Sequence, residues 1–181
     1  MMNICVFCGS ATGINPLYAE SARRLGSLMA QSSVGLVYGG GNIGLMGVVA
    51  DAVLKEGGRV TGVIPDFLVR REVGHRGVTS LEIVDSMHQR KQRMADLANG
   101  FIALPGGWGT LDELAEILTW RQLGLIDQPV VILNINHFFD PLLAQMRLMS
   151  EEGFLKPAYL EMLQIAFSPE EAFSCIYPKK G

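Results

Sequence analysis

The sequence has little charge, and the two signs are nearly balanced. Only 18% of its 181 residues are charged, and the formal net charge is -3 at pH 7. A protein that binds nucleic acid through its surface usually carries a clear basic excess. We therefore expect no nucleic-acid partner.

Cysteines are equally scarce. The three cysteines, Cys5, Cys8 and Cys175, form no disulfide framework, which is typical of a protein of the reducing cytoplasm. The pair Cys5-x-x-Cys8 has the spacing of a redox or metal site. However, it lies in a strand-like segment, where residues three apart point to opposite faces, and zinc would need further ligands nearby. We interpret both residues as buried core thiols and expect no metal.

Long apolar runs are also missing. No run reaches the roughly 18 residues that a membrane-spanning helix needs. The start of the chain, MMNICVFCGS, lacks the charged segment of a signal peptide. We expect neither a membrane partner nor a targeting segment, and a cytoplasmic location.

Short apolar runs that alternate with helix-like patterns are what the sequence does contain. Strands are predicted at 4–10, 34–41, 59–65, 81–84, 100–107, 129–135 and 163–167, and helices at 16–31, 43–57, 86–99, 110–124, 138–153 and 169–176. Continuous apolar strands between helices indicate a parallel sheet that is covered on both faces. The predicted fold class is therefore α/β, a doubly wound parallel sheet flanked by helices, in a single domain of residues 1–181.

Three glycine-rich loops each follow a predicted strand, at Gly9–Gly13, Gly39–Gly44 and Gly106–Gly109. The carboxyl ends of parallel strands meet at one edge of a sheet, where ligands bind. We therefore expect the three loops to lie together at this edge.

The second of these loops, Gly39-x-Gly41-x-x-Gly44, opens a predicted helix and matches the dinucleotide fingerprint. Its glycines would let the backbone approach a phosphate at the helix N-terminus. A dinucleotide is disfavoured, because the loop follows the second strand and the next strand ends in Pro65 rather than a ribose-binding acid. A tight strand-to-helix turn without a ligand remains the alternative.

The stretch Pro105–Glu113, PGGWGTLDE, repeats this arrangement at another helix start. Two such loops on one edge favour a ligand that carries a phosphate. Thr110-x-x-Glu113 has the spacing of a capping box, in which the glutamate only closes the helix start. The same carboxylate would also lie near both phosphate loops, so the spacing leaves Glu113 open as a cap or as a catalyst.

Two predicted helices carry further candidates. Helix 86–99 places Arg90 on a stripe with Met87 and Met94. We therefore expect its guanidinium to lie beside apolar residues and to face the ligand. The alternative is that Arg90 belongs to a solvated basic face of the helix. Helix 110–124 is apolar on two sides, so both sides are predicted to be buried. We expect one side to face the sheet and the other to contact a second subunit. Glu113 would then lie at the mouth of this second contact.

At these residues the chain resembles the LONELY GUY (LOG) proteins, cytokinin riboside 5′-monophosphate phosphoribohydrolases. The resemblance runs over nearly the whole chain, through CVFCGS, LVYGGGNIGLMG, GVIP, SMHQRK, FIALPGGWGTLDE, TWRQLG and PVVILN. It implies a Rossmann-like fold and usually a homodimer, and we expect no cofactor. It also implies hydrolysis of the N-glycosidic bond of a nucleoside 5′-monophosphate, AMP or a cytokinin nucleotide or both, to free base and ribose 5-phosphate.

The resemblance also implies roles for individual residues. Arg90 and Glu113 match the catalytic pair. The positions that match substrate contacts are Glu72, Lys91, Gly107, Trp108, Gly109, Thr110, Leu111, Asp112 and Thr119. The positions that match the phosphate side are Gly39, Gly40, Gly41, Gly44, Met46 and Gly106.

The sequence departs from the family at Trp108 and Asp112, where many members have tyrosine and glutamate; Trp108 is expected to reshape the ribose or base pocket. Members of the family were once labelled possible lysine decarboxylases, but no lysine here stands in a recognisable pyridoxal-phosphate setting.

Two other classes of function remain alternatives. One is a nucleotide or molybdenum-cofactor carrier that binds without hydrolysis, and the other is a disfavoured NAD(P)-dependent oxidoreductase.

Overall fold

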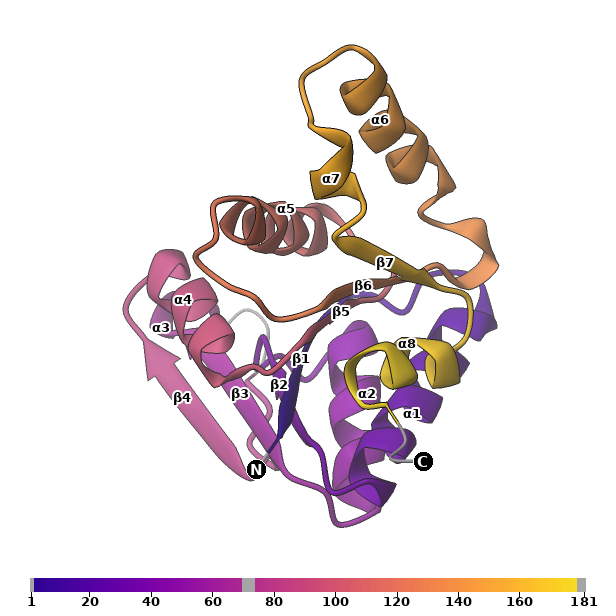
Figure 1. The fold of residues 1–181 in the computed structure, drawn as a ribbon. Coiled ribbons are helices and arrows are strands. Elements are labelled where there is room, and N and C mark those ends of the chain that lie inside the picture. Colours follow the sequence, from indigo (N-terminus) through magenta and orange to yellow (C-terminus); the bar gives the residue numbers. More distant parts are fainter. Residues whose placement is uncertain (1, 70–73, 179–181) are drawn as a thin grey trace.

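A single parallel sheet forms the centre of the molecule in the computed structural model, which describes residues 2–69 and 74–178 (Figure 1). Within these residues the sheet has seven strands in the order β4-β3-β2-β1-β5-β6-β7, and every neighbouring pair is parallel. The strands are β1 (Asn3–Phe7), β2 (Gly35–Tyr38), β3 (Val60–Pro65), β4 (Ser80–Val84), β5 (Phe101–Ala103), β6 (Val130–Leu133) and β7 (Leu163–Ala166). The predicted doubly wound α/β fold is confirmed.

Helices cover both faces of this sheet (Figure 1). They are α1 (Pro16–Gln31), α2 (Gly44–Lys55), α3 (Asp66–Val69), α4 (Met87–Leu97), α5 (Trp108–Gln122), α6 (Asp140–Glu151), α7 (Pro157–Leu160) and α8 (Pro169–Ile176), with a 3-10 turn η1 (Ile135–His137). Side chains of α1, α2 and α8 pack into one hydrophobic cluster, and side chains of α4, α5 and α6 pack into the other. None of the helices in the described ranges is long and apolar enough to cross a bilayer.

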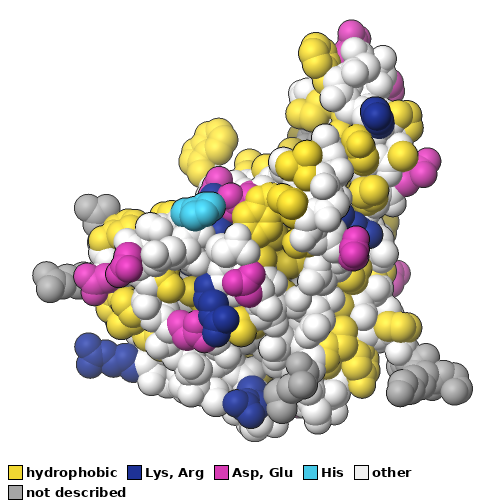
Figure 2. All heavy atoms as spheres, turned by 60° about the vertical axis from the view of Figure 1, so that its left-hand side comes forward, with side chains coloured by type: hydrophobic (Ala, Val, Ile, Leu, Met, Phe, Trp, Pro, Cys, Tyr) yellow, Lys and Arg dark blue, Asp and Glu magenta, His cyan; other side chains and the backbone are white. Residues whose placement is uncertain are grey.

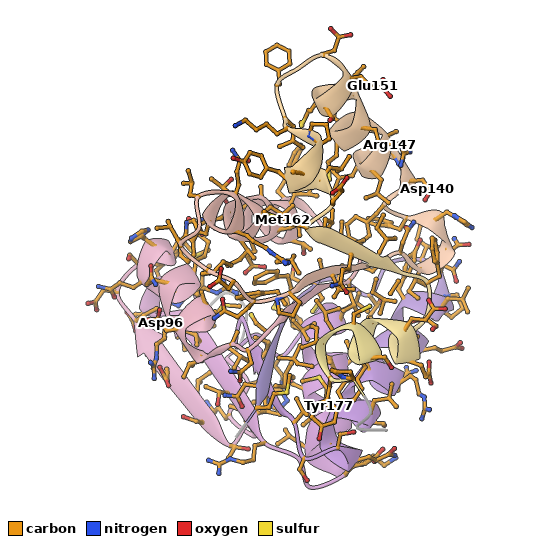
Figure 3. The ribbon with its side chains drawn as sticks, in the orientation of Figure 1. Asp96, Asp140, Arg147, Glu151, Met162 and Tyr177 are labelled. Carbon is orange, nitrogen blue, oxygen red and sulfur yellow. The ribbon has the colours of Figure 1, made fainter. Side chains whose placement is uncertain are left out.

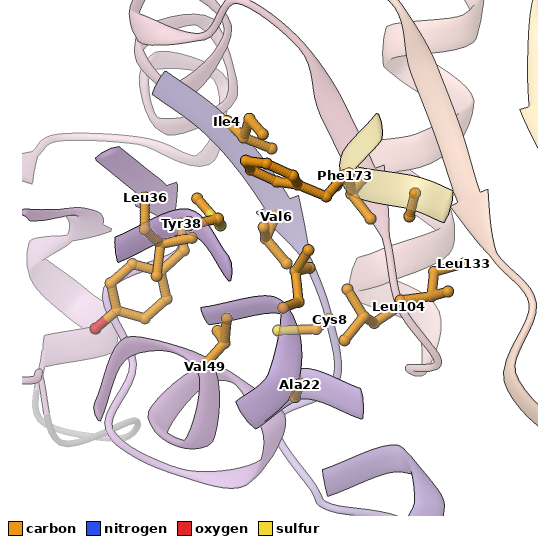
Figure 4. Close-up of a cluster of buried hydrophobic side chains, with 14 of the residues drawn as sticks. Ile4, Val6, Cys8, Ala22, Leu36, Tyr38, Val49, Leu104, Leu133 and Phe173 are labelled. Atoms are coloured by element: carbon orange, nitrogen blue, oxygen red, sulfur yellow. The ribbon is translucent and has the colours of Figure 1, made fainter. Parts of the chain in front are cut away.

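The alternation of side chains along β1 separates the two clusters. Ile4, Val6 and Cys8 belong to the cluster under α1, α2 and α8 (Figure 4), whereas Cys5 and Phe7 belong to the opposite one. Cys5 and Cys8 are both buried and lie on opposite faces, as the period of a strand predicts. They are core thiols.

The strand order changes direction beside β1. The chain moves outward from β1 through β2 and β3 to β4, and then returns to place β5 on the other side of β1. Loops that leave β1 and β5 therefore part to opposite faces of the sheet, which opens a crevice at their carboxyl ends. This is the position where the glycine-rich loops meet.

An arm formed by α6 and α7 projects from the body of the molecule, and Arg147 and Glu151 lie along it (Figure 3). Leu148, Met149 and Phe154 are exposed on this arm. Its base is fixed to α5, because Arg121 donates from Nη1 to the carbonyl of Met162, 2.9 Å away. On the face turned forward in Figure 2, basic and acidic side chains are interspersed rather than gathered into one basic patch.

Several elements differ from the sequence-based predictions, and the start of α5 matters most for the site. Helix α5 begins at Trp108, two residues before the predicted start, because Gly107 is its N-cap. Between the predicted strands 59–65 and 81–84, where no helix was predicted, the structure forms the short helix α3 (Asp66–Val69). A four-residue helix is too short to show a hydrophobic period, so the sequence pattern does not reveal it.

Candidate functional site

The loops that follow β1, β2 and β5 are joined by backbone contacts at the crevice. Gly9 donates its N–H to the carbonyl of Pro105 at 3.1 Å, and Leu45 donates to the carbonyl of Gly9 at 3.0 Å. Gly44 has a φ of 63°, which favours glycine, and a Cβ added there would overlap the backbone of Ser10. The three loops therefore lie together at one edge of the sheet, as predicted.

Gly44→Ala is expected to destabilise the protein by about 1–3 kcal/mol more than Gly57→Ala. Both glycines have positive φ, but a Cβ at Gly57 would meet no atom within 4 Å, whereas one at Gly44 would overlap Ser10. The difference between the two variants thus isolates the crowding from the backbone strain. Chemical denaturation of both variants measures it, and equal losses would show that the close approach of the loops is unimportant for stability.

A cavity opens between these loops and helices α4 and α5. Its lining comes from the ends of β1, β2 and β5 and from the first turns of three helices: Val6, Cys8, Gly9, Ser10, Gly39, Met46, Met87, Arg90, Gly107, Trp108, Gly109, Thr110 and Glu113. It brings together both members of the predicted catalytic pair and most of the residues predicted from PGGWGTLDE. A second cavity adjoins it, and Gly106 lines that one.

Helices α2 and α5 both begin beside this cavity without a capping side chain, although the N–H of Leu45 in α2 is bonded to the carbonyl of Gly9. The N-cap of α2 is Ile43 and that of α5 is Gly107, and neither makes a side-chain cap hydrogen bond. In contrast, Asn15 and Ser86 cap α1 and α4 with their side chains. Unsatisfied N–H groups and the positive end of the helix dipole make such termini favourable for an anion.

Arg90 lies at the inner wall of the cavity and is only 5% exposed. Its Nη2 donates to the carbonyl of Gly39 at 3.1 Å and lies 3.8 Å from Oε1 of Glu113. Its Nε is buried and has no hydrogen-bond partner among the described residues. Gly39 makes this position possible, because a Cβ at Gly39 would overlap Nη2. The prediction that Arg90 leaves the solvated face of its helix is confirmed.

Glu113 faces Arg90 from helix α5 and is 8% exposed. The capping-box alternative does not form, because Gly107 is the N-cap and Thr110 is the third residue inside the helix. Thr110 is buried, with its hydroxyl packed against Gly106. The interpretation of Glu113 as the acid of a Thr110 capping box is therefore excluded.

The orientation of α5 also corrects a second prediction. Glu113 was expected at the mouth of a contact between α5 and a second subunit. It is buried within this subunit together with Leu114 and Ile117, so this side of α5 faces the sheet and the cavity. The sequence shows two apolar stripes but does not show which of them meets the sheet.

Cys8 forms part of the cavity wall as a neutral thiol. Burial raises the pKa of Cys8 far above its usual range, and the nearby Glu113 carboxylate raises it further. A thiol with so high a pKa is a poor nucleophile. The ionic groups that line the cavity within the described residues are thus Arg90 and Glu113.

Several predicted contacts lie outside the cavity. The Nζ of Lys91 is 3.1 Å from carboxylate oxygens of both Asp112 and Glu116. Although partial burial lowers the pKa of Lys91, its hydrogen bonds to these two carboxylates raise it overall. Leu111 is half-buried beside them, and Asp112 is exposed.

Thr119 is also apart from the cavity. It is exposed near the far end of α5, where its hydroxyl donates to the carbonyl of Ala115. It lies 11 residues beyond Trp108 in the helix, which corresponds to roughly 16 Å along the axis. Glu72 lies outside the described residues.

Of the residues predicted on the phosphate side, some line the cavity and others shape the loop behind it. Gly39 and Met46 line the cavity, whereas Gly40, Gly41 and Gly44 shape the turn behind it.

The sequence-based predictions named no individual residue of the first glycine-rich loop, although Gly9 and Ser10 line the cavity. The available signal was the position of that loop after the first strand. Met87 was also missed, because a methionine on a helical stripe is typical of a core.

Comparison with known proteins gives consistent relatives. A family model described as "Possible lysine decarboxylase" matches residues 46–176. "Cytokinin riboside 5'-monophosphate phosphoribohydrolase" from Rhodococcoides fascians is 44% identical over 175 residues, which are 96% of this chain and 88% of that protein. "Cytokinin riboside 5'-monophosphate phosphoribohydrolase LOG1" from Arabidopsis thaliana is 45% identical over 168 residues, 93% of this chain and 79% of that protein.

Solved structures share the fold at lower identity. The Moco carrier protein from Chlamydomonas reinhardtii is 19% identical, with a TM-score of 0.72 over 97% of this chain and 95% of that one. The molybdenum cofactor binding protein from Rippkaea orientalis is 22% identical, with a TM-score of 0.70 over 97% and 94%. At these identities the comparison establishes the architecture alone.

Proposed function

The chain belongs to the LOG family that its relatives define, and from this premise we propose that it hydrolyses the N-glycosidic bond of a nucleoside 5′-monophosphate. The proposed substrates are AMP, a cytokinin riboside 5′-monophosphate, or both, and the products are the free base and ribose 5-phosphate. The observation that carries the proposal is the buried pair of Arg90 and Glu113, 3.8 Å apart, beside two uncapped helix N-termini. No cofactor is needed for this reaction, and we expect none.

In this proposal, the 5′-phosphate binds at the N-termini of α2 and α5, near Met46 and the residues Gly107–Thr110 that line the cavity. Backbone N–H groups there bind its oxygens. Binding the phosphate, which does not react, supplies energy that holds the ribose in a reactive pose next to Glu113. The exposed indole of Trp108 then lies at the cavity, where it contacts the ribose or the base and influences which base is accepted.

Bond cleavage builds positive charge on the sugar. As the bond from C1′ to the base nitrogen breaks, the electron pair leaves with the base, which takes up a proton. Glu113 stabilises the oxocarbenium-like sugar and orients or deprotonates the water that bonds to C1′. Arg90 fixes the ligand and balances the charge of the Glu113 carboxylate. The alternative label of lysine decarboxylase is disfavoured, because no lysine is among the described residues that line the cavity.

The protein is expected to release free base from AMP and from isopentenyl-AMP. Incubation with a panel of nucleoside monophosphates, followed by chromatography of base and ribose 5-phosphate, measures this directly. The nucleosides without phosphate are the matched controls and should react far more slowly, because they cannot use the helix N-termini. Tight binding of AMP without release of base would contradict hydrolysis and would favour a carrier.

We also propose a homodimer. Trp108 is exposed at the start of α5, and Leu123 and Leu125 are exposed just after its end, so a second copy packed along this helix would remove apolar surface from water. Thr119 cannot contact a ligand in the cavity of its own subunit, so a substrate contact by Thr119 requires a second copy. Sedimentation of the protein should give twice the mass of the chain. Leu123→Asp is expected to shift it toward the monomer, and a monomer in the unmodified protein would contradict the proposal.

The cellular location is part of the same proposal. The three cysteines are free thiols. We therefore expect the enzyme to act in the cytoplasm, where such thiols stay reduced.

A further inference from the structure

His75 is a buried histidine that the proposed reaction does not use. It lies between α3 and β4, in the part of the connection that the structure describes, and it is 7% exposed. Its Nε2 is 2.9 Å from Oδ1 of Asp51 on α2, and its Nδ1 is 3.2 Å from the N–H of Gly77. A buried imidazole with both nitrogens engaged is suited to holding segments together.

The hydrogen-bond partners define the state of the imidazole ring. The N–H of Gly77 can only donate, so Nδ1 must be the unprotonated nitrogen. The proton is then on Nε2, which donates to the carboxylate of Asp51. The neutral ring connects α2 to the turn that follows His75.

The backbone of the same residue holds the second glycine-rich loop. The N–H of His75 donates to the carbonyl of Gly40 at 2.9 Å, and Gly74 forms an antiparallel bridge with Gly41. The preceding carbonyl, that of Gly39, accepts the hydrogen bond from Nη2 of Arg90. Asp51 thus anchors His75, His75 holds Gly40, and the adjoining peptide holds Arg90.

Packing also restrains this part of the loop, because Gly40 is buried close to Val63, Ile64 and Leu81. Gly40 has a φ of 76°, which is accessible to glycine at no cost, so its own backbone does not select the bound orientation. The contacts from Gly74 and His75 add direction to this packing, and they orient the Gly39 and Gly40 carbonyls relative to Arg90. Because Arg90 must lie within ångströms of the reacting sugar, a small shift of this loop changes catalysis.

We propose that His75 is a positioning residue of the nucleotide site, which orients Arg90 through the peptides of Gly39 and Gly40. This inference rests on the proposed hydrolysis. It adds a connection from the surface of α2, through Asp51 and His75, to the catalytic pair.

Three substitutions separate the contacts of the ring. His75→Gln can still donate to Asp51 from its terminal amide. His75→Asn can accept from Gly77 but is too short to reach Asp51. His75→Ala removes both contacts. In the same way, Asp51→Asn keeps an acceptor oxygen for Nε2, whereas Asp51→Ala does not.

We expect His75→Ala, His75→Asn and Asp51→Ala each to lower kcat for base release from AMP about tenfold, which corresponds to about 1.4 kcal/mol. His75→Gln and Asp51→Asn should stay within about twofold of the unmodified protein. The double variant of His75→Ala and Asp51→Ala should lose no more than either single variant, because both act through one contact. Rates are compared well below the melting temperature, where a role in stability alone leaves kcat unchanged.

Amide hydrogen exchange gives a readout that does not depend on activity. In the ligand-free protein, residues 39–45 should exchange at least about tenfold faster in His75→Ala than in the unmodified protein or in His75→Gln. Unchanged exchange in His75→Ala, or an unchanged kcat in that folded variant, would overturn the proposal. If the unmodified protein releases no base, the proposed hydrolysis fails, and the exchange comparison still decides whether His75 orients the loop.

Discussion

Glu113→Gln is expected to lower the rate of base release from AMP by about 10²–10⁴-fold. The amide has nearly the shape of the carboxylate but carries no charge, so it can neither stabilise a cationic sugar nor accept a proton from water. AMP binding should change only by a few fold, because the phosphate is held at the helix N-termini rather than by Glu113. Single-turnover kinetics measure the chemical step, and calorimetric titration with AMP measures binding.

The matched control for this variant is Glu116→Gln. Glu116 follows Glu113 on the same helix but pairs with Lys91 outside the cavity. It should keep activity within a few fold. If Glu113→Gln kept the turnover of the unmodified protein, Glu113 would not be the catalytic carboxylate. If both variants lost activity equally, the loss would come from the helix rather than from the reacting group.

Arg90→Lys is expected to lower kcat by about 10²-fold although it keeps the positive charge. One nitrogen of the planar guanidinium, Nη2, donates to the Gly39 carbonyl and also faces Glu113. A lysine has a single ammonium, which cannot reproduce the fork of a guanidinium. Steady-state kinetics with AMP measure the loss, and denaturation curves show whether the variant is folded.

Arg93→Lys is the control on the same helix. Arg93 pairs with Glu82 through its Nε at 2.6 Å, on the exposed side of α4. Its replacement should leave kcat within about twofold, since exposed ion pairs contribute little. Wild-type turnover in Arg90→Lys would mean that charge alone matters at this position and that the geometry of the guanidinium does not.

The role of Glu113 is also a question that the sequence raises by itself. In the stretch PGGWGTLDE, Thr110 and Glu113 have the spacing of a helix cap, and both roles of the glutamate were open. The helix starts earlier, at Trp108, because the backbone of Gly107 takes the N-cap position. A difference of two residues in the helix start, which sequence patterns do not resolve, decides whether Thr110 is a cap or part of the helix.

Much of the fold followed from the sequence. Continuous apolar strands such as VVIL at Val130–Leu133 can only be buried on both faces, and helices of matching length lie between them. Glycines after strands marked the loops where the backbone comes close to other groups. Arg90 was recognisable because its helix places it on the same stripe as Met87 and Met94.

Other features depend on contacts between residues far apart in the chain. Lys91 is next to Arg90 in the sequence, but the helix turns it toward Asp112 and Glu116 instead of the cavity. The pair of His75 and Asp51 joins residues 24 positions apart, and the sequence offers no pattern that connects them. Ser10 reaches the cavity only because Gly44 allows the two loops to touch.

The sequence by itself determined the class of fold and the edge of the sheet at which the glycine-rich loops meet, and it led to the prediction that phosphate binds there. These follow from local periodicity and from the special backbone of glycine, which act within a few residues. Only the tertiary structure decided which charged groups face each other. It places Arg90 and Glu113 together from two helices on one side of the sheet, and it removes Lys91 and Thr119 from the cavity. Such pairing depends on helix rotation and loop contact across the fold, and neither is encoded in local spacing.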